Sequence, residues 1–141
     1  MNQKGLTMIE LLIVISLIGV LSGILLNVIG STKQKQRAED AVKRTNLEKA
    51  VAGIEAFRSG EGRYPISPLE VTDYIKSWPG AEYIYNTNLP AYTEFWIYVP
   101  MSVVYNPPRM FKYCSNPPGS ELPKIKECID NLINRGSCTP C

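Results

Sequence analysis

The sequence predicts an α+β protein in which a long N-terminal helix packs against a small antiparallel sheet. Three observations predict this fold. Residues 11–29 carry no charge, the apolar residues that follow recur at helical spacing, and short aromatic-rich runs of alternating polarity fill the second half of the chain. A chain of 141 residues has room for one domain with an extension.

Composition excludes several classes of function. The chain has no histidine, which removes His-based catalytic triads, His-ligated zinc and the commonest general base. Fifteen basic and thirteen acidic side chains leave a net charge of +2, which is too weak to argue for nucleic-acid binding by itself. The sequence also shows no Ser-Lys pair, paired carboxylates or phosphate-binding loop. We therefore expect no enzymatic activity, metal or cofactor.

The apolar run predicts a membrane-spanning helix. Only Ser16, Ser22 and Asn27 are polar between residues 11 and 29. A helix of this length covers roughly 28 Å, which is close to the hydrocarbon thickness of a bilayer. Core helices of soluble proteins are rarely apolar on every face over such a length.

This segment differs from an ordinary secretory signal. No small-residue cleavage site follows the apolar run, whereas Gly5 precedes it and Glu10 lies at its start. A carboxylate inside hydrocarbon costs roughly 2.5–3.5 kcal/mol. Glu10 should therefore have a partner or a function, the alternative being a position at the headgroup level.

The stretch K-G-L-T-M-I-E-L-L-I-V-I, which begins at Lys4, resembles the class III signal of type IV prepilins and type II secretion pseudopilins. The resemblance implies that a prepilin peptidase cleaves after Gly5 and methylates Leu6, which stands where phenylalanine is usual. It also implies that Glu10 meets the freed amine of a neighbouring subunit. Two unit charges about 4 Å apart attract by roughly 4 kcal/mol at an effective dielectric constant of 20, which is enough to set the axial register of packed helices.

The resemblance divides the chain into four parts and implies a pilin fold. Residues 1–5 are the leader peptide, and residues 6–30 are the transmembrane and assembly half of a spine helix. Residues 31–60 are the amphipathic half of that helix, and residues 61–141 form the globular head. Because type IV pilins commonly close a C-terminal loop with a disulfide, the resemblance also implies a disulfide-stapled C-terminal segment.

Helical periodicity supports the amphipathic half of the spine. Five apolar residues fall on one helical face, and Gly60 and Gly62 supply a stop. The pattern predicts one helix from Leu6 to Phe57. The apolar residues of this face are Leu47, Ala50, Val51, Ile54 and Phe57.

The head is expected to be a meander of three or four strands packed on the spine. Alternating polarity predicts strands at residues 82–86, 93–99, 102–105 and 110–113, and an apolar face predicts a final helix over residues 121–135. Eight tyrosines and two tryptophans are compatible with a stacking platform for DNA or sugar. Their alternate strand positions favour core and inter-subunit packing instead.

Four cysteines lie in the last 28 residues, at Cys114, Cys128, Cys138 and Cys141. Their spacing contains a single C-x-x-C, which disfavours a four-cysteine zinc site, and this pair does not open a helix as a redox-active pair would. Two structural disulfides are expected. Three pairings are possible, and Cys114 with Cys128 or with Cys138 is preferred.

These features predict a structural subunit of a type IV pilus-like filament. Its expected partners are copies of itself, the prepilin peptidase, an inner-membrane assembly platform with its ATPase, and membrane lipid before assembly. A pseudopilin of a type II secretion system is the main alternative. A DNA-uptake minor pilin, the one candidate that would contact nucleic acid, and a membrane-tethered thiol protein are less favoured.

The expected location is the inner membrane, with a single pass and the head outside the cytoplasm, followed by a filament at the cell surface or in the periplasm. Lys4 precedes the apolar run whereas Lys33, Lys35 and Arg37 follow it, which by itself favours the opposite orientation. Long C-terminal domains cross regardless of flanking charge. Disulfide formation also requires an oxidising compartment.

Overall fold

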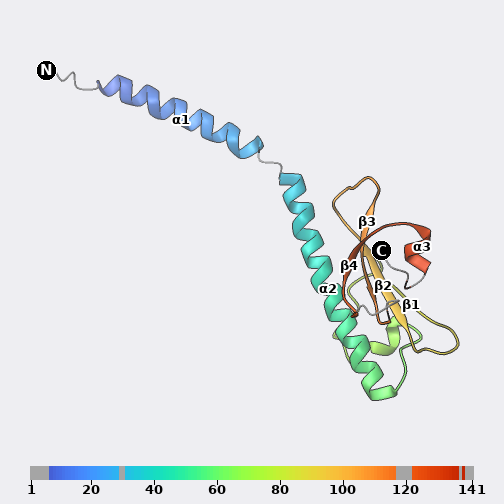
Figure 1. Cartoon of the computed structure of the whole chain (residues 1–141). Coiled ribbons are helices and arrows are strands. Elements are labelled where there is room, and N and C mark those ends of the chain that lie inside the picture. Colours follow the sequence, from blue (N-terminus) through green and yellow to red (C-terminus); the bar gives the residue numbers. More distant parts are fainter. Residues whose placement is uncertain (1–6, 29–30, 117–121, 137, 139–141) are drawn as a thin grey trace. The chain divides into compact units, whose positions relative to one another are not determined.

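The computed structural model describes residues 7–28, 31–116, 122–136 and 138 (Figure 1). The chain divides after Lys35 into two compact units, and each is considered by itself. Gly5, Leu6 and Cys141 lie outside the described residues. Leader cleavage after Gly5, methylation of Leu6 and the pairing of Cys141 therefore stay predictions.

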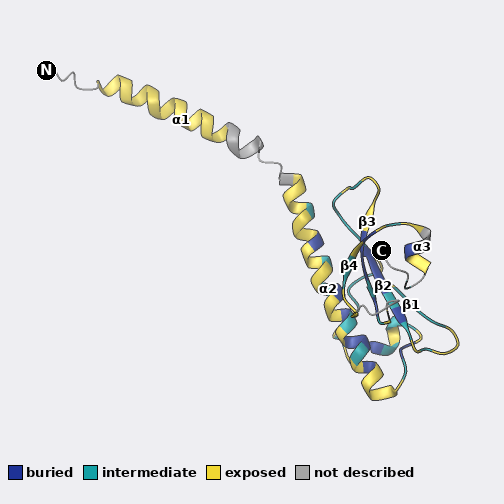
Figure 2. Cartoon of the chain, viewed as in Figure 1, coloured by how far each residue is buried: buried dark blue, intermediate teal, exposed yellow. Residues whose placement is uncertain are grey.

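Helix α1 (Met8–Val28) is apolar on every side of the helix apart from Glu10 in its first turn. From Met8 to Leu21, every Met, Leu, Ile and Val side chain is at least 50% exposed, and Figure 2 colours this part of α1 as exposed. Among the residues that the structure describes, no helix has both the length and the apolar character needed to span a bilayer. The predicted transmembrane segment is therefore not confirmed.

Helix α2 (Ser31–Glu61) is amphipathic, and its apolar stripe is buried against the head. The helix ends later than the expected Phe57, because Gly60 is still helical and Gly62 provides the stop. Gly62 has a φ of 74°, and its N–H donates to the carbonyl of Arg58 at 2.8 Å. A single spine helix was predicted, and the structure describes two helices, α1 and α2. That the helix continues through residues 29–30 stays a prediction.

The head contains a four-stranded antiparallel sheet in the order β1-β2-β3-β4, which confirms the predicted meander and the α+β class. One core joins α2 to this sheet, so that Leu47 and Ile54 of the helix pack with Phe95 and Ile97 of β2. The strands are β1 (Ile84–Thr87), β2 (Phe95–Pro100), β3 (Arg109–Cys114) and β4 (Lys126–Ile129).

The predicted strand at residues 102–105 is wrong, because this segment is part of the connection from β2 to β3. Its backbone is held by Asp40 of α2, a buried carboxylate that accepts hydrogen bonds from the N–H groups of Ser102 and Val103. In the neighbouring turn of α2, Lys43 donates to the carbonyl of Pro100 at 2.9 Å. Bonds to the helix thus replace the strand pairing that the sequence pattern suggested.

The predicted helix over residues 121–135 is also wrong. Within the described stretch 122–136, residues 126–129 form β4, and only α3 (Leu132–Gly136) is helical. Pairing with β3 decides the conformation of this segment, since Cys128 lies opposite Met110 and both side chains are buried. Alternate residues of β4 face opposite sides, so Ile129 is left 48% exposed.

Gly53 allows the segment after the 3-10 helix η1 (Pro68–Val71) to lie directly against α2. A Cβ added at Gly53 would overlap the Cγ2 methyl group of Ile75. Two turns further along the same face of α2, a Cβ at Gly60 would lie 2.7 Å from the hydroxyl of Tyr74. These two glycines therefore set the distance between α2 and residues 74–75.

Replacing Gly53 by alanine should lower the free energy of unfolding by about 1–3 kcal/mol, because overpacking outweighs the gain of about 1 kcal/mol in helix propensity. Denaturant unfolding of the full chain in detergent micelles measures the change. The double variant Gly53→Ala with Ile75→Ala should lose less free energy of unfolding than the two single variants lose together, because it removes the clashing methyl group. A neutral Gly53→Ala variant, or strict additivity, would contradict the contact.

Candidate functional site

The first turn of α1 carries a capping box formed by Thr7 and Glu10. Thr7 precedes the helix, and its N–H and Oγ1 hydroxyl both donate to Oε2 of Glu10, at 2.8 and 2.7 Å. The N–H of Glu10 approaches Oγ1 of Thr7 at 3.4 Å. This reciprocal arrangement satisfies backbone donors that the start of a helix otherwise leaves without partners.

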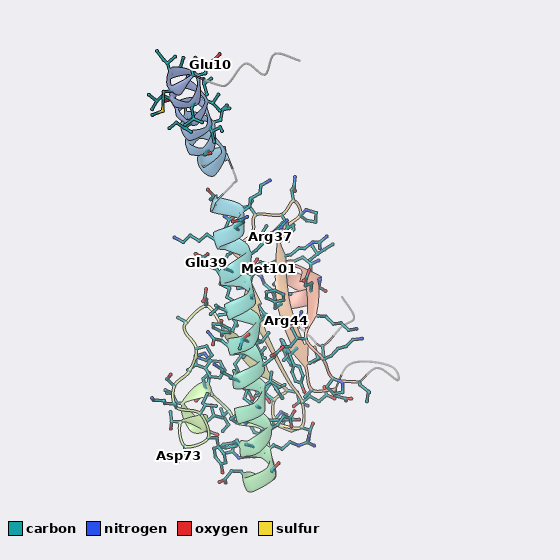
Figure 3. The ribbon with its side chains drawn as sticks, turned by 90° about the vertical axis from the view of Figure 1, so that its left-hand side faces the viewer. Glu10, Arg37, Glu39, Arg44, Asp73 and Met101 are labelled. Carbon is teal, nitrogen blue, oxygen red and sulfur yellow. The ribbon has the colours of Figure 1, made fainter. Side chains whose placement is uncertain are left out.

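The capping box gives Glu10 a partner within its own chain. Figure 3 shows this carboxylate at the start of α1, where it is exposed. Both Thr7 bonds use Oε2, and no described residue donates a hydrogen bond to Oε1. Because a carboxylate can accept several hydrogen bonds, Oε1 is available to a further donor without loss of the cap.

Thr7 was not predicted as a site residue, because Glu10 was expected either to meet a neighbouring subunit or to lie at the headgroup level. The spacing T-x-x-E before an apolar run was the signal that identifies it. Gly5 and Leu6, the predicted residues of leader cleavage and N-methylation, lie outside the described part of the chain.

A second candidate site holds two thiols. Cys114 at the end of β3 is buried, Cys138 is partly buried, and neither is in a disulfide. The two thiols hydrogen-bond to each other, and Cys138 also donates to the carbonyl of Phe95 at 3.6 Å. Cys114 therefore faces Cys138, as one of the two preferred pairings requires.

The other preferred pairing, Cys114 with Cys128, is wrong for this structure. Cys128 is disulfide-bonded whereas Cys114 is free, and no two described cysteines are joined to each other. Register explains the separation, since Cys128 pairs with Met110 at the other end of β3. Cys141 lies outside the described residues, so the two expected disulfides are not confirmed.

The surroundings make the two thiols unequal. The hydrogen bond from Cys138 lowers the pKa of the Cys114 thiol and raises the pKa of Cys138. Lys112, which is only 2% exposed, favours the Cys114 thiolate further. Burial in turn lowers the pKa of Lys112. Since thiolate is the nucleophile in disulfide chemistry, Cys114 is the more reactive member of the pair.

Glu55 of α2 joins the helix to the sheet through tyrosine hydroxyls. Tyr64 donates to both carboxylate oxygens at 3.2 Å, and Tyr113 of β3 donates at 3.5 Å. Arg58 donates to the Tyr64 hydroxyl at 2.7 Å. Burial, followed by the Glu55 charge, raises the pKa of Tyr113 to about 12.

No metal site accompanies these groups in the described residues. No three Cys, Asp or Glu side chains of that part of the chain gather closely enough to hold an ion. The tyrosine cluster is a packing feature, as the sequence interpretation of the aromatic residues expected, since Tyr64 is buried in the core that joins α2 and β2.

Comparison with known proteins confirms the predicted N-terminal signal. Residues 1–26 match the prokaryotic N-terminal methylation motif, which is the class III signal peptide of type IV pilins and pseudopilins. The chain thus carries the signal of this class of proteins. No curated protein and no solved structure matches the chain.

The raised pKa of Tyr113 predicts a loss of stability in alkaline solution. An unfolded tyrosine titrates near pH 10, so between about pH 10 and pH 12 the unfolded chain binds fewer protons than the folded one. The free energy of unfolding should fall as the pH rises through this range. Denaturant unfolding of Tyr113→Phe should show a flatter decline over this range than that of the unsubstituted protein. Equal slopes would contradict the assignment.

The thiol pair should close under oxidising conditions. When the purified full chain meets oxidised glutathione, Cys114 should attack it and form a mixed disulfide, and Cys138 should then attack the Cys114 sulfur and displace glutathione, so that two protons and two electrons pass to glutathione. Peptide mapping should find Cys114 linked to Cys138, and Cys114→Ser should leave Cys138 as a thiol or a glutathione adduct. Two thiols that persist, or a bond from Cys114 to a different cysteine, would contradict the pairing.

Proposed function

We propose that the protein is a structural subunit of a type IV pilus-like filament. Cleavage after Gly5 and methylation of Leu6 prepare the chain, which then assembles through α1. The methylation motif at residues 1–26 carries the proposal. The α+β head and the uncovered apolar helix are consistent with a pilin fold, and the proposed location is the inner membrane followed by the filament.

The exposed surface of α1 supports self-association. Its eleven large apolar side chains from Met8 to Leu21 are each at least half exposed. Leaving them in water would cost at least roughly 15 kcal/mol at about 1.5 kcal/mol each. Lipid covers such a surface before assembly, and the α1 helices of neighbouring subunits cover it afterwards. A subunit can leave the membrane only if contacts with neighbouring α1 helices replace its contacts with lipid.

The capping box explains how Glu10 can keep a partner while α1 moves from lipid into contact with neighbouring subunits. Thr7 occupies Oε2 in the single chain, so the carboxylate keeps its local partner throughout assembly. The freed amine of a neighbouring Leu6 then binds at Oε1. In this arrangement the helix cap and the subunit contact coexist, and a fixed charge pair sets the axial register between apolar helices.

The prepilin peptidase, an assembly platform and its ATPase are the partners that this route requires. A pseudopilin of a type II secretion system would share the signal and the route, and the short G-R-Y-P loop after α2 resembles such proteins. The Cys114 and Cys138 pair at the end of β3 favours the pilin, in which a disulfide commonly closes the C-terminal region. Composition of purified fibres distinguishes a major subunit, which would dominate their mass.

Glu10→Ala should leave a processed, membrane-held protein that fails to enter fibres. Loss of a charge pair worth a few kcal/mol should reduce fibre yield by at least roughly tenfold. Quantifying the subunit in sheared fibres and in membranes gives the ratio, and intact mass reports removal of Met1 to Gly5. The exposed Glu39→Ala variant is the matched control and should assemble normally.

Two results would oppose the proposal at different points. Normal fibre yield from Glu10→Ala would remove the register mechanism while leaving the filament role in place. A mature polypeptide that still carries Met1 to Gly5, or one that is cut beyond Ile29, would remove the filament role itself.

A further inference from the structure

A groove runs between α2 and the segment that follows η1. Its volume is about 390 Å³, and it is lined by Asn46, Lys49 and Ala50 of the helix and by residues 75–79 on the other side. This volume falls within the range of about 300–1,000 Å³ in which proteins bind small molecules. The assembly surface of α1 contributes no residue to it.

The groove exists because Gly53 admits Ile75 against the helix. Asn46, Lys49, Ala50 and Gly53 recur at helical spacing and share one face of α2. Gly53 takes the close contact, and the chain then runs past the other three residues towards Pro79. The buried Ala50, whose side chain is small, leaves the hollow above it open.

Trp78 forms a fixed aromatic wall of this groove. Its indole N–H donates to the carbonyl of Tyr83 at 3.3 Å, and its ring meets Tyr85 edge-on at 6.4 Å between centroids. Tyr83 is also bonded to the opposite wall, because its hydroxyl donates to the carbonyl of Lys43 in α2 at 3.2 Å. Both walls are therefore anchored to the same tyrosine, and the groove is preorganised.

The charged residues that line the groove are both cations. Lys49 and Lys76 are exposed, and neither forms an ion pair with a described residue. Nearby cations of α2 are paired instead, Lys43 with Glu82 at 3.3 Å and Arg44 with Glu48 at 3.6 Å. With no acidic residue among its lining side chains, the groove favours an anionic ligand.

We propose that this groove binds a carboxylate-bearing sugar of the hexuronic acid class, alone or as one unit of an acidic polysaccharide. Trp78 and Pro79 offer a flat apolar wall to the face of a sugar ring. The Asn46 amide and the Ser77 hydroxyl supply donors and acceptors for sugar hydroxyls, and the two lysines attract the carboxylate as point charges. This binding goes beyond the filament role, since it needs no assembly.

A phosphate ligand fits the groove less well. Phosphate sites in proteins commonly use the N-terminus of a helix, a nest of backbone amides or the planar fork of arginine. Asn46, Lys49 and Ala50 lie within the body of α2, and the lining residues include no arginine. An aromatic wall with amide and hydroxyl groups is instead the surface that a ring with many hydroxyls matches.

Tryptophan fluorescence tests the proposal on the full chain in neutral detergent micelles. The chain has two tryptophans, so a Trp96→Phe background leaves Trp78 as the reporter. A trisaccharide of galacturonic acid should change the emission saturably, and uncharged maltotriose should bind at least roughly tenfold more weakly. The Lys49→Gln with Lys76→Gln variant should lose at least roughly tenfold in affinity for the acidic sugar.

The matched control removes the same charge elsewhere. Lys33→Gln with Lys35→Gln should bind the acidic trisaccharide as the background protein does, and circular dichroism should show all variants to be folded. Equal weakening by both double variants, equal affinity for the neutral sugar, or no saturable change would overturn the proposal. Tighter binding of a short thymidine oligonucleotide would overturn it in favour of a nucleic-acid ligand.

Discussion

The apolar surface of α1 is the constraint on which the account depends. From Met8 to Leu21 its large side chains are each at least half exposed in the described part of the chain, and lipid or other protein can cover them. Glu10 lies at the start of this surface, where a charge would be costly without partners. The capping box with Thr7 relieves that cost locally and leaves one carboxylate oxygen for a second contact.

The head is built around one stripe of α2. Leu47 and Ile54 pack against the sheet, and Asp40 fixes the connection between β2 and β3. Gly53 allows the segment that follows η1 to lie against the helix. Apolar, polar and steric contacts of a single helix thus position every part of the head that lies against it. The same closeness at Gly53 creates the groove beside Trp78.

Local patterns were sufficient to predict much of this arrangement. The glycine and glutamate spacing gave the N-terminal signal, and helical periodicity gave the buried face of α2, because both depend on residues close in sequence. Residues 102–105 and 121–135 were misassigned since distant partners decide them. Asp40 holds the first segment in a connection, and pairing with Met110 makes a strand around Cys128.

In the candidate sites, too, features set by residues close in sequence were predictable and features set by distant residues were not. Thr7 was recognisable from T-x-x-E spacing, because a capping box is a local motif. The contact of Cys114 with Cys138 was one of several pairings that spacing alone left open. The buried position of Lys112 beside these thiols, and the convergence of Lys49 with Lys76, depend on tertiary packing that no sequence pattern encodes.

A cryo-electron microscopy map of purified fibres tests the central claim most directly, because it shows what covers α1. The account predicts that α1 helices lie in contact at the fibre centre, with the N-terminal nitrogen of Leu6 beside Oε1 of a neighbour's Glu10 and Oε2 still bonded to Thr7. A fibre whose α1 helices remain apart and exposed, or in which each Glu10 lies far from every N-terminus, would contradict it.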